Sequence, residues 1–159
     1  NMSALMEAIE AIEAIEAIDQ DKRNEVLSDL IALWERSVRA SHTFLTERNI
    51  AEIKPQVAPA IVAISHFLVI REGGKIVAFM GVEEDSIEML FIDPLAWKKG
   101  YGRALIQYAI DELDAIYVDV NEDNHGARAF YEALGFAMFD YSETDGVGNP
   151  FPIMHLKYS

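Results

Sequence analysis

The chain has 159 residues, 51% of them hydrophobic and 25% charged, which predicts one folded domain over residues 1–159. Its formal net charge of −14 disfavours nucleic-acid binding, because such a surface repels phosphate backbones. The absence of cysteine excludes disulfides, thiolate catalysis and cysteine-ligated zinc. No apolar run could span a membrane and no signal-peptide pattern opens the chain, so we expect a cytoplasmic protein.

A Glu-Ala-Ile repeat dominates the first 19 residues, and its period of three matches neither a strand nor a helix. Glutamate and alanine favour helix, whereas isoleucine favours strand, so both remain open for this low-complexity segment. A helix is predicted from about residue 21 to 38, where apolar side chains line one side. A second helix is predicted from Thr46 to about Ile64, disturbed at Pro55.

The pattern then changes to short β-branched and aromatic runs, which predict strands. Two glycines, Gly73 and Gly74, separate the first two runs and indicate a hairpin. Later in the chain, Asn124 is a candidate N-cap of a helix and Gly135 its stop signal. The predicted elements are strands at 66–72, 73–84 and 86–93, a helix at 100–113, a strand at 115–120, a helix at 124–135 and strands at 136–141 and 151–158. This order predicts an α/β fold with a mixed sheet.

A basic loop stands out in this acidic chain between the strand that ends near residue 93 and the next helix. Lys98, Lys99 and Arg103 surround Gly100 and Gly102. A strand, a glycine loop and a helix start direct backbone N–H groups at one point, which suits a phosphate. The spacing fits neither the Rossmann fingerprint nor a Walker A loop. From this segment alone, a tight turn with solvated lysines remains an equal alternative.

Two longer segments, one of which contains the loop, resemble known sequence motifs. The segments "EMLFIDPLAWKKGYGRALIQYAI" and "VDVNEDNHGARAFYEALGF" resemble motifs A and B of the GNAT superfamily of N-acetyltransferases. The segments "LWERSVRASHTFL" and "GNPFPIMHL" are similar to a bacterial subset of that superfamily. The resemblance implies a mostly antiparallel mixed sheet with a splayed parallel pair and flanking helices. It also implies direct transfer of an acetyl group from acetyl-CoA to a primary amine of a small molecule or peptide.

The resemblance implies a set of cofactor-binding residues. The pantetheine arm of acetyl-CoA would pair with the backbone of Leu90, Phe91 and Ile92, and Asn124 would contact the arm as well as cap its helix. The pyrophosphate would lie on the loop, at Lys98, Lys99, Gly100, Tyr101, Gly102 and Arg103. Trp97 occupies the family's arginine or glutamine position, so we expect weaker or rearranged pyrophosphate contacts and not their loss.

Three residues are candidates for the chemistry. By resemblance, Tyr131 protonates the leaving sulfur, although its spacing also fits a core aromatic residue. Glu88 is a candidate base because it alternates with Leu90 and Ile92 on an apolar face, where burial would raise its pKa. A solvated sheet-edge position or a role in binding the acceptor is an equal alternative. His42 is a candidate substrate-binding residue, with an ordinary loop histidine as the alternative.

The remaining expectations concern partners and the competing class of function. No histidine has metal-ligand spacing, so no metal is expected. A homodimer in which the last strands pair between subunits is left open. The alternative function is a non-catalytic domain on the same fold that binds or senses acyl-CoA. The identity of the acceptor amine lies outside the sequence argument, because fold does not specify substrate.

Overall fold

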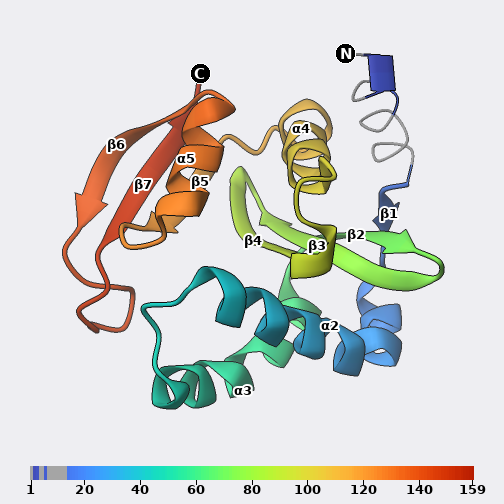
Figure 1. The fold of residues 1–159 in the computed structure, drawn as a ribbon, viewed down its shortest axis with the longest axis horizontal. Helices are drawn as coiled ribbons and strands as arrows, with labels where there is room; N and C mark the ends of the chain where they lie inside the picture. The colour runs from blue at the N-terminus through green and yellow to red at the C-terminus, as the bar shows by residue number, and fades with distance from the viewer. Residues whose placement is uncertain (1, 4–5, 7–13) are drawn as a thin grey trace.

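The computed structural model describes residues 2–3, 6 and 14–159, and Figure 1 shows its fold. Most of the Glu-Ala-Ile repeat lies outside the described residues, but its end forms a short strand. In chain order the elements are β1 (Glu16–Ala17), α2 (Gln20–Ser41), α3 (Glu47–Ala63), β2 (His66–Glu72), β3 (Lys75–Glu83), β4 (Ser86–Ile92), the 3-10 helix η1 (Pro94–Ala96), α4 (Tyr101–Leu113), β5 (Tyr117–Asn121), α5 (His125–Ala133), β6 (Phe136–Ser142) and β7 (Ile153–Tyr158).

The strands form a seven-stranded sheet in the order β1-β2-β3-β4-β5-β7-β6. All neighbouring strands are antiparallel except β4 and β5. This parallel pair is in register only at Ser86–Tyr117 and Ile87–Val118, so the two strands part beyond Ile87. The predicted mixed sheet with a splayed parallel pair is therefore confirmed. β6 is an edge strand, and the homodimer through the last strands stays a prediction.

Helices cover the sheet on both faces (Figure 1). Side chains of α2 and α3 form one hydrophobic cluster with one face of β2 and β3. Side chains of α4 and α5 form a second cluster with the other face and with β5 and β7. Strands β2 and β3 are buried on both faces, which explains their nearly continuous apolar sequence.

Local sequence signals account for the ends of the helices, but the prediction for the interior of α3 differs from the structure. Thr46 and Asn49 form a capping box at the start of α3. The predicted disturbance at Pro55 is wrong, because α3 continues past Pro55 and Pro59 to its end. Both prolines lie on the exposed side of the helix, where carbonyl groups that lose their N–H partners face water. Gly135 follows α5 with φ +103°, as predicted for a stop residue.

A buried arginine, Arg23, joins α2 to the end of α3, and no local sequence pattern indicated this contact. Arg23 is 2% exposed, and its guanidinium donates to the carbonyl groups of Ile18 and Ile61 at 2.9 and 3.0 Å. It also donates to the carbonyl group of Ile64. The bonds to Ile61 and Ile64 satisfy carbonyl groups that the end of α3 leaves without partners. Arg23 therefore ties the start of α2 to the end of α3.

Strand β4 contains a β-bulge at Glu88. Gly81 of β3 pairs with Met89, whereas the next residue, Val82, pairs with Ile87, so Glu88 is an extra residue on β4. An extra residue shifts the alternation of side chains by one position. The bulge lies at the point where β4 leaves β5, and it fixes which groups of β4 face the space between them.

The burial pattern of β4 reflects this bulge. Ile87, Leu90 and Ile92 all belong to the cluster under α4 and α5, whereas Phe91 belongs to the cluster under α2 and α3. The expected regular alternation of Glu88 with Leu90 and Ile92 is therefore interrupted at Glu88 itself, and its role as a base stays a prediction. Sequence periodicity assumed a regular strand, and the bulge interrupts it.

Candidate active site

A pocket of about 870 Å³ lies beside the part of β4 that has no partner strand on its β5 side. Its lining comes from four segments of the chain: the end of α2 with the loop after it, the end of β4, the glycine loop with the start of α4, and the start of α5. Most of the predicted site residues are among them: His42, Leu90, Phe91, Ile92, Lys98, Gly100, Tyr101, Gly102, Arg103, Asn124 and Tyr131. Lys99 and Glu88 are not part of this lining.

The backbone of β4 presents a free edge to this pocket. The N–H of Asp93 donates to a carbonyl group of β3 at 2.8 Å, so the backbone groups of the preceding residue point the other way. The carbonyl oxygen of Ile92 accepts a bond from the indole of Trp97 at 3.1 Å. By the same alternation, Leu90 points its backbone groups toward the pocket, whereas those of Phe91 point to β3. Two residues of the expected three thus offer a strand edge to a ligand.

The glycine loop has the geometry of an anion site. Lys98 and Gly100 have φ of +69° and +86°, and left-handed residues of this kind turn successive amides toward one side. In the described part of the chain, the amides of Lys98, Lys99, Gly100, Gly102 and Arg103 donate no hydrogen bond to another protein group. Because the start of α4 adds its positive dipole end, the loop can hold a phosphate or pyrophosphate.

The three basic side chains of the loop divide into two groups. Lys98 and Arg103 are exposed and line the pocket. Lys99 instead forms an ion pair with Glu72 of β2 at 2.8 Å. This pairing raises the pKa of Lys99 and lowers that of Glu72, in both cases through their mutual hydrogen bond. The structure therefore places two of the three cations at the pocket.

Tyr131 is 6% exposed, and its ring packs edge-on against Phe130 and Phe136 at centroid distances of 5.0 and 5.5 Å. Burial raises the pKa of Tyr131, so the hydroxyl keeps its proton throughout the neutral range. In the described residues no group forms a hydrogen bond with this hydroxyl, and no fully buried polar atom lacks a partner. The hydroxyl is therefore accessible from the pocket that Tyr131 lines.

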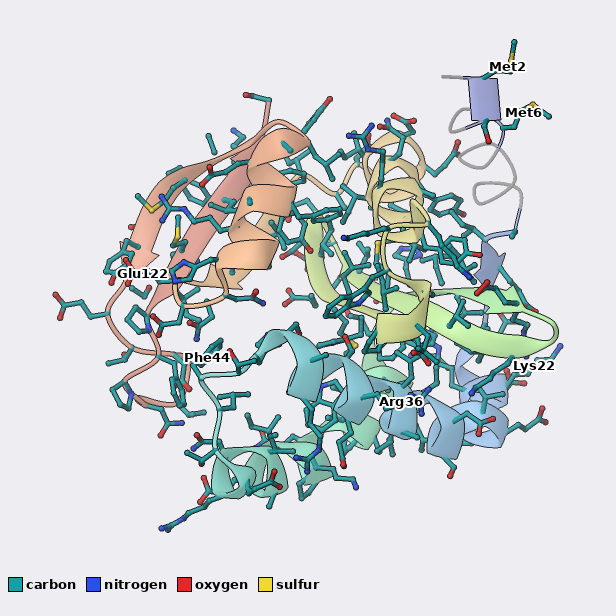
Figure 2. All side chains as sticks on the ribbon, viewed as in Figure 1. Met2, Met6, Lys22, Arg36, Phe44 and Glu122 are labelled. Carbon is teal, nitrogen blue, oxygen red and sulfur yellow. The ribbon has the colours of Figure 1, made fainter. Side chains whose placement is uncertain are left out.

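Asn124 caps α5 and also reaches across the pocket. Its Oδ1 accepts from the N–H of Ala127 at 3.1 Å, which confirms the predicted N-cap. Its Nδ2 lies 3.4 Å from Nε2 of His42, although the two residues are 82 positions apart in the chain. Phe44, labelled in Figure 2, follows in the same loop, and its ring contacts those of His42 and Phe151 at centroid distances of 5.6 and 6.1 Å. These contacts bring the loop after α2 against the C-terminal half.

Glu88 lies apart from this group of residues. Its side chain is exposed, and it is the extra residue of the β4 bulge. Partial desolvation raises its pKa, while a hydrogen bond with Ser86 acts in the opposite direction. A raised pKa suits a base, but the position does not bring the carboxylate to the pocket lining.

Within residues 2–3, 6 and 14–159, no group of three or more histidine, aspartate or glutamate side chains is arranged to hold a metal ion. In the same part of the chain, no helix is long and apolar enough to cross a membrane.

Comparison with known proteins identifies the family. Residues 26–136 match the model of the acetyltransferase (GNAT) family. The chain belongs to this family. It is 33% identical over 136 residues to the peptidyl-lysine N-acetyltransferase YjaB of Salmonella typhimurium, a match that covers 86% of this chain and 94% of that one. It is 30% identical over 136 residues to the peptidyl-lysine N-acetyltransferase YiaC of Escherichia coli, covering 85% and 93%.

Solved structures agree with this assignment. The solution structure of apo YjaB from Escherichia coli matches with a TM-score of 0.76 at 30% identity, over 91% of this chain and 95% of that one. The PaiA N-acetyltransferase of Thermoplasma acidophilum in complex with coenzyme A has a TM-score of 0.67 at 19% identity, over 91% and 98%, which shows a shared fold. Because N-acetyltransferases match most of the chain, this GNAT protein is an N-acetyltransferase, and the non-catalytic alternative is set aside.

Proposed function

We propose that this GNAT protein transfers an acetyl group from acetyl-CoA directly to a primary amine of a protein or peptide, with a lysine side chain as the first candidate. The observation that carries the proposal is that the free edge of β4, the glycine loop and the hydroxyl of Tyr131 all line one pocket. These parts come from separate segments of the chain, and each meets one requirement of acetyl transfer.

The residues present fit acetyl-CoA. Leu90 and Ile92 offer backbone donors and acceptors for the amides of a pantetheine arm, as a strand edge does for an added strand. The amides of the glycine loop, with Lys98 and Arg103, offer donors and positive charge for the pyrophosphate. When bound, acetyl-CoA supplies the activated acetyl group and a thiolate leaving group.

Groups of the protein itself supply the proton for the sulfur and the hydrogen bond to the developing oxyanion. The hydroxyl of Tyr131 is a proton donor for the sulfur, because its raised pKa keeps it protonated and its position opens it to the pocket. The backbone N–H of Leu90 is the candidate donor to the developing carbonyl oxyanion, since it faces the pocket from a rigid strand. Asn124 holds the start of α5, and with it Tyr131, in place.

A peptidyl amine is favoured as the acceptor by two observations. The relatives that match over most of the chain are named as peptidyl-lysine N-acetyltransferases. The protein carries a net charge of −14, and Asp123 lines the pocket, so a cationic acceptor is attracted to this surface. A free polyamine or other small amine fits the charge equally, and the experiment below separates the two.

Binding and turnover test the proposal together. Isothermal titration of the purified protein with acetyl-CoA should give saturable binding. Mass spectrometry should then detect acetylation of lysine-containing peptides, with free spermidine and α-amino peptides as competing acceptors. Acetylation of small amines alone would overturn the peptidyl acceptor. The absence of binding at millimolar acetyl-CoA would overturn the donor.

A further inference from the structure

The hydrogen bonds around His42 determine which of its two ring nitrogens carries a proton. Its Nδ1 lies 2.8 Å from Oγ of Ser41, and that oxygen lies 2.7 Å from the carbonyl oxygen of Ser37. A carbonyl oxygen only accepts, so the hydroxyl of Ser41 gives its proton to Ser37. The hydroxyl oxygen must then accept from His42, which places a proton on Nδ1 and leaves Nε2 without one.

The opposite side of the ring leads to the same assignment. Asn124 accepts from the N–H of Ala127 through Oδ1, so its other atom, the donor Nδ2, is the one that faces His42. A donor on that side requires Nε2 to be an acceptor. Two independent networks, one from α2 and one from α5, therefore present the lone pair of Nε2. At 3.4 Å the contact with Asn124 is long, and a closer donor would replace it at little cost.

The surroundings of His42 keep the ring neutral. The side chain is partly buried beside Phe44, and this burial lowers its pKa. Among the described residues, no acidic side chain forms an ion pair with His42. The charged and titratable groups that share its pocket are Asp123 and His125 before and at the start of α5, Tyr131 on α5, and Lys98, Tyr101 and Arg103 on the glycine loop and α4. A neutral imidazole whose Nε2 lone pair has only a long hydrogen-bond contact is an acceptor for a proton.

We propose that His42 is the base of the acetyl transfer, an inference that rests on the proposed function. The amine enters the pocket uncharged. Nε2 of His42 takes the proton that leaves the amine nitrogen as the nitrogen–carbon bond forms and the carbon–sulfur bond breaks. Tyr131 gives its proton to the sulfur, and exchange with solvent then restores both residues. His42 thus replaces Glu88 in this role, because the carboxylate of Glu88 lies outside the pocket lining.

The first experiment measures kcat/KM against pH for the wild type and for His42→Gln, with the best lysine peptide from the acetylation screen. We expect kcat of the variant to fall about 100-fold at neutral pH, the lower end for loss of a positioned base. The ratio of kcat/KM for the wild type to kcat/KM for His42→Gln cancels the titration of the peptide amine. This ratio should be constant above the pKa of His42 and should fall tenfold per pH unit below it.

Matched variants separate catalysis from damage to the fold. His66→Gln alters an exposed histidine of β2 outside this pocket, and Glu88→Gln removes the competing base; both should retain activity within about threefold, because neither takes the proton. Binding of acetyl-CoA by His42→Gln, measured by calorimetry, should equal that of the wild type. A His42→Gln protein that binds acetyl-CoA and turns over at the wild-type rate would overturn the proposal.

Nitrogen-detected NMR of the histidine rings gives a readout that does not depend on turnover. The His42 ring should show a proton on Nδ1 and a titration midpoint below the ordinary value of about 6.5. In Ser41→Ala the proton should be held on Nδ1 less firmly, because only the long contact with Asn124 remains, and kcat should fall less than in His42→Gln. A proton fixed on Nε2 of the wild type would overturn the assignment even if acetyl transfer is active. Wild-type protein that neither binds acetyl-CoA nor acetylates amines would overturn the proposed function itself.

Discussion

The indole N–H of Trp97 donates to the carbonyl oxygen of Ile92 at 3.1 Å, and both residues line the pocket. Trp97 occupies the position where the family pattern has arginine or glutamine, yet it is 43% exposed and not part of a core cluster. It therefore satisfies an acceptor on the edge of β4 that an added strand would use. Binding of acetyl-CoA by this edge has to displace the indole or share the carbonyl with it.

Trp97 should report cofactor binding by its fluorescence. The protein has two tryptophans, and Trp34 is 4% exposed in the core beneath the sheet, so only Trp97 should respond to acetyl-CoA. Trp97→Phe should abolish the fluorescence change. It should also tighten binding about fivefold in calorimetry, because a hydrogen bond worth about 1 kcal/mol no longer competes. An unaltered fluorescence response in Trp97→Phe would contradict this prediction.

Tyr131→Phe should separate chemistry from binding and from stability. The variant keeps the ring packing on Phe130 and Phe136 and removes only the hydroxyl. We expect kcat to fall about 100-fold, with the Kd for acetyl-CoA unchanged. The free energy of unfolding, measured in urea, should change by less than about 1 kcal/mol, since the described residues form no hydrogen bond with the hydroxyl. A wild-type rate would remove Tyr131 from the reaction.

Gly100→Ala should weaken acetyl-CoA binding through the backbone. Gly100 has φ +86° and open space around it, so a Cβ meets no atom but strains the left-handed conformation. Gly74→Ala, at φ +81° in the β2–β3 hairpin, is a matched control with the same open space. Both should lose about 1 kcal/mol of stability. Only Gly100→Ala should raise the Kd, by about tenfold, because its loop carries the phosphate amides.

Asp93→Asn should lose stability in a pH-dependent manner. Burial alone would raise the pKa of Asp93, but the N–H of Leu95 and the guanidinium of Arg36 outweigh it, and the net pKa is lowered. A lowered native pKa gives stability that is present above the unfolded value of about 3.9 and disappears as the pH falls through the native value.

Urea unfolding of wild type and Asp93→Asn at several pH values would measure this effect. At pH 7 the wild type should be more stable by about 1 kcal/mol, since the 43% exposed Arg36 side chain is partly screened by water. The difference should shrink below about pH 4 and vanish once Asp93 is protonated. A difference that persists at pH 2 would show that the charge of Asp93 is not its cause.

The sequence predicted most elements because their signals are local. Apolar spacing, the cap at Asn124 and the stop at Gly135 depend on residues within one or two turns, and the structure confirms them. The two motifs also predicted a set of residues that mostly line one pocket. The exceptions depend on partners distant in sequence. Lys99 pairs with Glu72 of another strand, a contact that no local pattern encodes.

The sequence by itself determined the family, the order of elements and the glycine loop, because each of these depends on residue types at short separations along the chain. Only the tertiary structure decided which groups face the pocket. The bulge at Glu88 depends on the register between β3 and β4, and in the folded chain Leu90 and Ile92 line the pocket whereas Glu88 does not. The approach of His42 to Asn124 depends on how α2 and α5 pack against one sheet, which no spacing within either segment specifies.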